Sequence, residues 1–317
     1  MRTFRAVLTV GLILGGALTG HAQLSDAEKA LVLLGQHVSV ETNVVYKVAN
    51  HYEAKLDVYR PPHPAGPTPV LMMIHGGGWL FGSKEDSVLY LLPYLQMGFS
   101  VVNVEYRMGS VSLAPAAVED CLCALHWIGR NAKKYAFDLG KLVITGGSAG
   151  GHLALTTAMI PPSAGFENEC AYEDDQGWTG TFVDSRPKVA AVVNWFGITD
   201  VADMIQGPNL HGYAVSWLGN VPDREGLARR VSPLTYVRSG LPPILTIHGD
   251  ADKLVPYAHA VRLHEALTKA GVRNQLLTLP GAGHGGFTDE QELRAIETVR
   301  AFLVEVGVLA ARAQRTE

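Results

Sequence analysis

The segment "TGGSAGGH", Thr145–His152, places one serine among four glycines and between two apolar runs. The run before it, "KLVIT", has the β-branched composition of a strand, and the run after it, "HLALTTAMI", is compatible with a helix. The letters "GGSAG" fit the G-x-S-x-G pattern, in which a strand turns sharply into a helix and exposes the serine at the corner. Gly146 and Gly150 permit that corner because they lack side chains. We therefore predict that Ser148 is a nucleophile, the alternative being a glycine-rich turn with an unused serine.

A nucleophilic serine requires two further side chains. Its hydroxyl is weakly reactive near neutral pH unless a base lies within hydrogen-bond reach and a third group orients that base. Two later segments supply such groups, "HGDADKLVP" from His248 and "GAGHGGF" from Gly281. We predict that His284 takes the proton of Ser148, while Asp252 accepts a hydrogen bond from the other ring nitrogen. Both residues follow predicted strands, where α/β sheets place their sites.

Other polar residues of these segments receive structural predictions. Asp250 competes with Asp252 for the position of the acid, but its place directly after a strand and beside a glycine suits a turn. His75 and His248 each end a predicted strand before a glycine, so we predict that they brace loops. His152, one turn into the predicted helix, is expected to pack or to hydrogen-bond beneath the site.

The segment "HGGGWLFGS", His75–Ser83, suits the negative charge that develops on oxygen during acyl transfer. Its three consecutive glycines allow backbone N–H groups to approach a substrate closely. Such a loop pairs with the N–H group of the residue after the nucleophile, here Ala149. A phosphate-binding loop is the alternative, but the lysine of a P-loop and the ribose-binding acid of a dinucleotide site are missing.

Apolar, β-branched runs alternate with stretches of helical period, which predicts an α/β fold with a mostly parallel sheet flanked by helices. The predicted strands are 55–59, 70–74, 100–104, 142–145, 190–195, 244–248 and 275–279. Apolar positions at helical spacing over 118–128 and over 296–306 predict two helices, of which the second opens with a capping box at Thr288 and Gln291, and another helix runs from about Tyr257 and ends at Gly271.

Two segments interrupt this alternation. Residues 161–188 are polar and lack periodicity, so we predict a long excursion on the surface. Residues 200–243 are predicted to form a small cap over the site. Since no linker separates two parts of the chain, we predict a single domain over residues 23–317.

The first 22 residues are typical of a secretory signal peptide. Arg2 and Arg5 precede an apolar run from Ala6 to about Leu18, and small residues follow, so we place the cleavage after Ala22. The run is shorter than the roughly 20 residues of a membrane-spanning helix, so we expect no stable membrane insertion after cleavage. We predict a secreted or periplasmic protein, the alternative being an uncleaved anchor.

The charge of the chain argues against one class of binding partner, and its cysteine spacing and acidic residues argue against a disulfide and a metal site. Removal of the signal peptide leaves 24 basic and 30 acidic residues, a formal charge of −6, which disfavours nucleic acid as a partner. Cys121 and Cys123 lie two apart in a helical pattern and point to different faces, which leaves Cys170 without an obvious mate. We therefore expect no structural disulfide. The acidic run at residues 173–175 lacks the spacing of a calcium loop, so we predict a solvated loop and no bound metal.

Together these segments resemble the α/β-hydrolase superfamily, specifically carboxylesterases with an HGGG loop, and among them bacterial acetyl xylan or feruloyl esterase-like proteins. The resemblance covers nearly all of the chain after the signal peptide and includes "LDVYRP", "HGGGWLFGSK", "VVNVEYR", "GGSAGGHLAL", "PPILTIHGDADKLVPY" and "GAGHGGF" in this order. It implies a catalytic triad of Ser148, Asp252 and His284. It implies oxyanion-hole donors at Gly77, Gly78 and Ala149, with Gly76 less favoured.

The residue before the serine departs from one branch of that superfamily. The hormone-sensitive-lipase branch usually has an acidic residue there, whereas this chain has Gly147, which favours the carbohydrate-esterase branch. Kynurenine formamidases share an HGG-W loop and a similar triad, so hydrolysis of an aryl formamide is an alternative. Export argues against it, because that substrate is intracellular.

We therefore predict a secreted serine esterase that acts through a covalent acyl-enzyme, without a metal or organic cofactor. The expected substrates are small esters or acylated polysaccharides with short acyl or aromatic groups, such as acetyl or feruloyl groups on plant polysaccharide. A catalytically inactive binding protein of the same fold is the remaining alternative. Trp79 and Trp195 are predicted to contact the substrate. Other aromatic residues near the motifs could line an acyl or sugar pocket, but we expect most of them to lie in the core: Phe196, Trp217, Tyr257 and Phe287.

Overall fold

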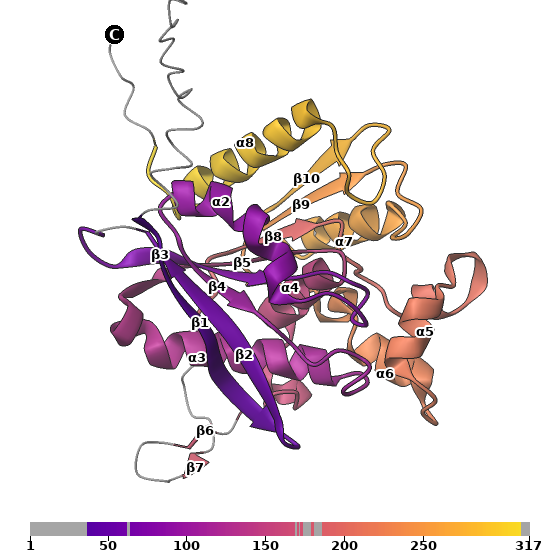
Figure 1. Cartoon of the computed structure of the whole chain (residues 1–317). Helices are drawn as coiled ribbons and strands as arrows, with labels where there is room; N and C mark the ends of the chain where they lie inside the picture. The colour runs from indigo at the N-terminus through magenta and orange to yellow at the C-terminus, as the bar shows by residue number, and fades with distance from the viewer. Residues whose placement is uncertain are drawn as a thin grey trace, which may run out of the picture. The chain divides into compact units, whose positions relative to one another are not determined.

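An eight-stranded sheet organises the described part of the chain (Figure 1). The computed structural model describes residues 37–61, 64–168, 170, 172–173, 179–180 and 186–311, which belong to one unit, His37–Glu317. The predicted signal peptide, residues 1–22, lies outside the described residues. The strand order is β1-β2-β4-β3-β5-β8-β9-β10. The strands are β1 (Ser39–Ala49), β2 (Tyr52–Arg60), β3 (Thr68–Ile74), β4 (Ser100–Val104), β5 (Phe137–Gly147), β8 (Ala191–Trp195), β9 (Ile244–Gly249) and β10 (Asn274–Leu279).

The sheet is mostly parallel, as predicted. Strand β2 pairs antiparallel with β1 and with β4, and every neighbouring pair from β4 through β10 is parallel. All seven predicted strands are present, and β4 has the predicted bounds. Because parallel strands end at the same edge of a sheet, the segments that follow β3, β5, β8, β9 and β10 leave it on one side.

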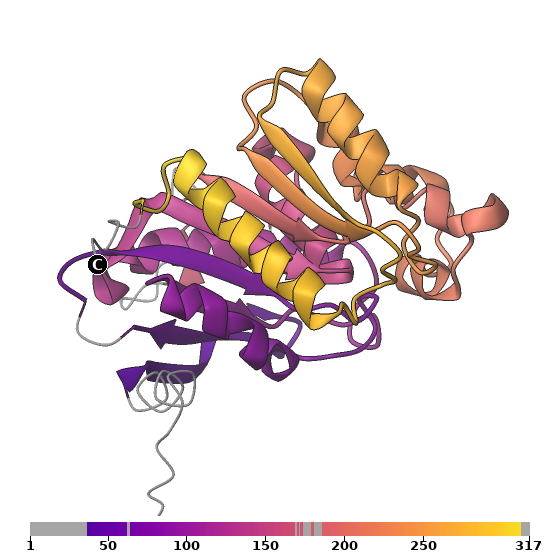
Figure 2. The same ribbon diagram turned by 90° about the horizontal axis from the view of Figure 1, so that it is seen from above.

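Helices form the connections between the parallel strands, and one further helix follows the last strand. They are α2 (Val88–Gln96), α3 (Ala116–Tyr135), α4 (Ala149–Met159), α5 (Gly212–Leu218), α6 (Arg224–Arg230), α7 (Ala258–Lys269) and α8 (Asp289–Glu305). Short 3₁₀ turns are η1 (Lys84–Ser87), η2 (Pro162–Ala164), η3 (Asp203–Ile205), η4 (Gly207–Asn209) and η5 (Pro233–Tyr236). Figure 2 shows α2 and α8 on one face of the sheet and α7 on the other. Helices α3 and α4 pack against each other.

The predicted helix ends are confirmed. At the start of α8, the Thr288 hydroxyl accepts from the N–H group of Gln291, whose side chain accepts from the N–H group of Thr288, at 3.3 and 3.0 Å. Both bonds satisfy N–H groups at the helix terminus. After α7, Gly271 has a φ of +70°, which a residue without a side chain adopts at no steric cost.

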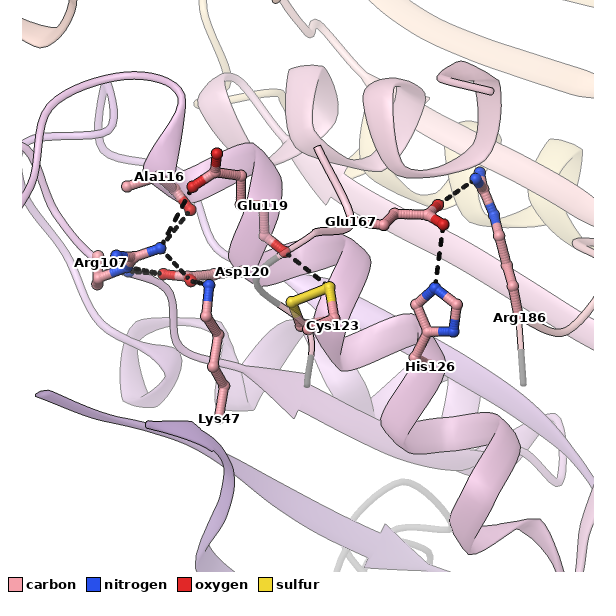
Figure 3. The surroundings of a disulfide bond; sticks show 10 residues. Lys47, Arg107, Ala116, Glu119, Asp120, Cys123, His126, Glu167 and Arg186 are labelled. Carbon is pink, nitrogen blue, oxygen red and sulfur yellow. Dashed lines mark hydrogen bonds and ion pairs between the residues drawn. A yellow bond between two sulfur atoms is a disulfide. The ribbon is translucent and has the colours of Figure 1, made fainter. Parts of the chain in front are cut away.

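Strand β1 was not predicted from the sequence. It lies at the edge of the sheet, its residues from Ser39 to Asn43 are all exposed, and its register with β2 shifts twice. Its inward side chains include a charged one, Lys47, which is buried and lies 2.9 Å from Asp120 of α3 (Figure 3). Arg107 contacts the same carboxylate at 2.8 Å. The apolar alternation that identifies a strand is therefore weak here, because an ion pair takes the place of an apolar contact.

A disulfide joins Cys123 of α3 to Cys170, so the expectation of no structural disulfide is wrong (Figure 3). The spacing argument excluded only a bond between Cys121 and Cys123, and Cys121 is indeed a buried free thiol. The partner of Cys123 is Cys170, which lies in the predicted surface segment 161–188, so this part of the segment contacts α3. There, Glu167 contacts His126 of α3 at 3.2 Å and also pairs with Arg186.

The excursion over 161–188 is described only in part. Its described elements are η2 and a hairpin of β6 (Tyr172–Glu173) and β7 (Thr179–Gly180). The acidic residues Glu169, Asp174, Asp175 and Asp184 lie outside the described residues, and the side chain of Glu173 is not described either. Within the described ranges, no helix is long and apolar enough to cross a membrane. No group of three or more His, Cys, Asp or Glu side chains in those ranges is placed to hold a metal ion.

We predict that the double substitution Cys123→Ser and Cys170→Ser lowers the free energy of unfolding by about 2–4 kcal/mol, because the bond closes a long loop of the unfolded chain. The two cysteines are 47 residues apart. Urea unfolding with and without a reductant measures the effect. The reductant should lower the midpoint of the wild type and leave that of the double variant in place. An equal response of the two proteins would contradict the prediction.

Candidate active site

Ser148 stands at a corner between β5 and α4. It precedes the first residue of α4, with φ of +57° and ψ of −121°, and its N–H group donates to the carbonyl oxygen of Trp195 at 2.9 Å. A positive φ at a residue with a side chain is uncommon and concentrates at functional sites. A side chain on Gly150 would overlap the carbonyl oxygen of Ile74, and one on Gly146 would lie 2.5 Å from that atom. The glycines of the predicted corner are therefore required by close backbone contacts.

The structure brings Ser148, Asp252 and His284 together. His284 Nε2 lies 2.8 Å from Ser148 Oγ, and His284 Nδ1 lies 2.7 Å from Asp252 Oδ2. The three residues follow β5, β9 and β10, whose carboxyl ends share one edge of the sheet. An ionised carboxylate only accepts hydrogen bonds, so Nδ1 carries the hydrogen and Nε2 is free to accept from the serine hydroxyl.

Asp252 is held by four N–H groups. Its side chain has no exposed surface. Oδ1 accepts from the backbone N–H groups of Leu254 and Val255 at 2.8 and 3.0 Å, and Oδ2 accepts from His284 and from His248, the latter at 3.1 Å. Burial by itself raises the pKa of Asp252, but these donors outweigh it and hold the pKa well below its ordinary value. The carboxyl group is therefore ionised at neutral pH.

Asp250 has the turn role that its position predicts. Its Oδ1 accepts from the backbone N–H group of Gly281 at 2.7 Å, which ties the loop after β9 to the loop after β10.

His75 braces its own loop, as predicted. Its ring stacks on Tyr106 with centroids 4.4 Å apart, and Nδ1 lies 2.8 Å from the carbonyl oxygen of Gly76. The carboxylate that contacts His284 is that of Asp252.

The glycine loop after β3 lies beside the serine. A side chain on Gly76 would meet the carbonyl oxygen of Gly147 at 2.9 Å and Ser148 Cβ at 3.6 Å. Gly77 and Gly78 follow with φ of +110° and +60°. Among the described residues, the backbone N–H groups of Gly77 and Gly78 have no backbone acceptor, and Ala149 is the first residue of α4, whose N–H group has no partner within the helix. These groups are therefore free to donate to a substrate oxygen.

Trp79 follows Gly78 in this loop, and its side chain turns into the core beneath the loop and does not face a substrate. Its side chain is fully buried, stacks on Trp217 with centroids 4.0 Å apart, and donates from Nε1 to Nδ1 of His152 at 3.1 Å. His152 Nε2 donates in turn to the carbonyl oxygen of Val231 at 2.7 Å. The predicted substrate contact of Trp79 is thus corrected, because its ring has no exposed surface. His152 hydrogen-bonds beneath the site, as predicted, and burial lowers its pKa to about 3.

Phe196 flanks the histidine, whereas the core was the more expected place for it. Its φ of +40° is strained for a bulky residue, and its half-buried ring lies edge-to-face with His284, with centroids 4.8 Å apart. A side chain on Gly147 would lie 3.3 Å from this ring, so Phe196 occupies the space beside that glycine. The ring of Phe287 lies edge-to-face with that of Phe196, with ring centroids 5.7 Å apart. Trp195, at the end of β8, is half-buried, and its predicted substrate contact stays a prediction.

The predicted cap segment, residues 200–243, contacts loops on both sides of the site. Tyr213 of α5 packs on Gly78, where an added side chain would lie 3.3 Å from the ring. The Tyr213 hydroxyl donates to the carbonyl oxygen of Leu254 at 3.1 Å, close to Asp252. His211 Nε2 lies 3.3 Å from the carbonyl oxygen of Lys253. Burial raises the pKa of Tyr213, so its hydroxyl keeps its hydrogen.

Family comparisons agree with this geometry. Residues 56–267 match the model of the family described as BD-FAE, and residues 227–311 match that of the TAP-like proteins. The chain is 29% identical over 242 residues to Esterase LipQ of Mycobacterium tuberculosis, covering 73% of this chain and 54% of LipQ. It is 30% identical over 240 residues to Esterase LipC of the same organism, covering 73% and 56%. The chain thus spans about half the length of these curated relatives.

A solved esterase is similar over most of the chain. The apo form of Thermogutta terrifontis esterase 2 superposes with a TM-score of 0.71 at 30% identity, covering 86% of this chain and 97% of that one. Other structures of the same esterase are a propionate-bound form and a form phosphorylated by paraoxon. The predicted α/β-hydrolase fold is confirmed.

We predict that His152 makes stability depend on pH. Its pKa is about 3 in the folded protein, far below the ordinary value of 6.5, so the unfolded chain binds more protons between these values. As the pH falls below the pKa of His152 in the unfolded chain, its contribution to the free energy of unfolding decreases. The decrease is about 2 kcal/mol between about pH 7 and about pH 5. Urea unfolding of the wild type and of His152→Gln at both pH values measures it. An equal pH dependence in the two proteins would contradict the assignment.

Proposed function

Since the chain belongs to the BD-FAE family of α/β-hydrolases, we propose that it is a serine esterase in which Ser148, His284 and Asp252 carry out the chemistry. The observation that carries this proposal is the continuous hydrogen-bonded chain from Asp252 Oδ2 through His284 to Ser148 Oγ, with links of 2.7 and 2.8 Å. An orienting acid, a base and a hydroxyl in this order are what activation of a serine requires. The names of the similar proteins, esterases among them, agree with it.

The reaction follows from these positions. Ser148 Oγ attacks the carbonyl carbon of the ester while its proton passes to His284 Nε2. The carbonyl oxygen becomes negative and accepts from the N–H groups of Gly77, Gly78 and Ala149. The ester bond then breaks, and the alcohol leaves with the proton from Nε2. Water, deprotonated by the same nitrogen, attacks the acyl-enzyme and releases the acid and the free serine.

We propose short-acyl or aromatic esters as the substrates. The contact of Tyr213 with Gly78 supports a restricted space next to the proposed oxyanion donors. The propionate-bound structure of the similar esterase also supports short acyl groups. Half-buried Phe196 and Phe287 beside His284 are suited to pack against a ring of the substrate. Acetyl or feruloyl groups on polysaccharide are the finer form of this proposal, supported by the resemblance to carbohydrate esterases.

We predict that Ser148→Ala abolishes hydrolysis of p-nitrophenyl acetate, with a loss of at least about 10³-fold in kcat, because the nucleophile is removed. Wild-type Ser148 should also be phosphorylated by paraoxon, which intact-protein mass detects and peptide mapping assigns. Thr157→Ser, a conservative change of a buried hydroxyl in α4, is the matched control and should keep its activity. An inactive wild type, or full activity of Ser148→Ala, would refute the proposal.

A substrate panel then separates the acyl classes. It contains acetylated xylan, methyl ferulate, a long-chain p-nitrophenyl ester and an aryl formamide. Release of acetate or ferulate by the wild type, with slower turnover of the long-chain ester, is the result expected from the proposal. Preference for the formamide would assign the chain to amide hydrolysis instead.

We further propose that the protein is exported. The sequence of residues 1–22 supports this, and so does the bond between Cys123 and Cys170, because structural disulfides persist mainly in oxidising compartments. Expression of the full chain in a bacterium should yield a periplasmic or released protein whose first residue is Gln23. N-terminal sequencing measures this. Recovery of the uncleaved chain in the cytoplasm would refute it.

A further inference from the structure

We propose that His248 is a positioning residue of this site: it fixes the orientation of the Asp252 carboxylate and limits the negative charge that Asp252 presents to His284. This inference rests on the proposed serine chemistry and adds a fourth side chain to it. From the sequence His248 was expected only to brace a loop, and the structure shows that its partner is the carboxylate of the site.

The contacts of His248 determine which of its nitrogens carries a hydrogen. The residue lies in β9, and its side chain has no exposed surface. Nε2 lies 3.1 Å from Asp252 Oδ2 and 3.0 Å from the carbonyl oxygen of Val255. A carboxylate and a carbonyl only accept hydrogen bonds, so Nε2 carries a hydrogen and donates to both. Among the described residues Nδ1 has no hydrogen-bond partner, so these two contacts alone orient the ring by hydrogen bonding.

Asp252 Oδ2 is thereby shared between two histidines. His284 donates to it at 2.7 Å from the segment after β10, and His248 donates at 3.1 Å from within β9. The two backbone N–H groups on Oδ1 hold one oxygen, and His248 holds the second against rotation of the carboxylate. An oxygen that accepts two N–H groups also stabilises a positive partner less than an oxygen that accepts one. His248 therefore lowers the stability of the protonated His284 ring.

The ionisable side chains around this pair allow a test by pH. Those that face Asp252 or His248 are His284, Tyr213, Tyr257 and His259. Burial raises the pKa of Tyr213 and lowers that of His259 to about 4. The acidic limb of the pH profile of kcat/KM, which reports on the essential base of the free enzyme, is therefore the readout for this test.

The experiment compares His248→Leu, which removes the N–H group, with His248→Gln, whose side-chain amide retains a donor at a similar reach. With p-nitrophenyl acetate, His248→Leu should lose about tenfold in kcat with little change in KM, because the carboxylate loses one of its anchors. The acidic limb of the pH profile of kcat/KM for His248→Leu should move up by about half a pH unit, since Asp252 then stabilises the protonated base more strongly. His248→Gln should keep the wild-type limb and most of the activity.

Circular dichroism and thermal unfolding establish that the variants are folded. If His248→Leu does not fold, His248→Asn replaces it, because that side chain is too short to reach Asp252 and should show the same loss and shift. A folded Leu or Asn variant with wild-type kcat and an unmoved limb overturns the proposal. So does a Gln variant that behaves like the Leu variant, since the volume of the ring would then matter and its N–H group would not.

The rate of phosphorylation by paraoxon separates this inference from the proposed function. It reports the reactivity of Ser148 without any assumption about the natural substrate, and it should fall about tenfold in His248→Leu but not in His248→Gln. A wild type that neither hydrolyses the ester nor reacts with paraoxon refutes the proposed function, and this inference with it. A reactive wild type with equally reactive Leu and Gln variants refutes the role of His248 alone.

Discussion

Two stretches of backbone touch at the corner that carries Ser148, and the geometry of the site depends on this contact. A side chain on Gly146 or Gly150 would collide with the carbonyl oxygen of Ile74. The parallel pairing of β3 with β5 brings these segments to one edge of the sheet. Because no side chain separates them, the glycine loop after β3 lies directly beside the serine. The proposed oxyanion donors and the proposed nucleophile are thus positioned by the same backbone contact.

The second requirement is a buried carboxylate that stays charged. Asp252 has no exposed side-chain surface, and burial of an unpaired charge is costly. Four N–H donors offset that cost, two from the backbone and two from His248 and His284. One of these donors is the proposed base itself, so the interactions that stabilise the carboxylate also orient the catalytic ring. The stability of the buried carboxylate and the proposed catalysis are therefore coupled at Asp252.

Buried contacts beneath and beside the site hold its loops in place. Trp79 leaves the glycine loop and enters the core, where His152 of α4 accepts its N–H group and donates to the segment that follows α6. On the far side, Tyr213 joins the cap to both the glycine loop and the Asp252 loop. The strained backbone of Phe196 persists because its N–H group donates to the carbonyl oxygen of Ile247 at 2.8 Å. Segments far apart in the chain are thereby fixed relative to the serine.

The sequence by itself determined seven of the eight strands of the main sheet, the corner at Ser148 and the residue types that its chemistry needs, because these depend on local spacing and on backbone freedom at glycine. Only the tertiary structure decided which side chains meet. It paired Cys123 with Cys170, turned Trp79 into the core and placed His248 on the carboxylate. Such contacts join segments that fold together from distant parts of the chain, and the direction of each side chain there is set by packing, which no local pattern encodes.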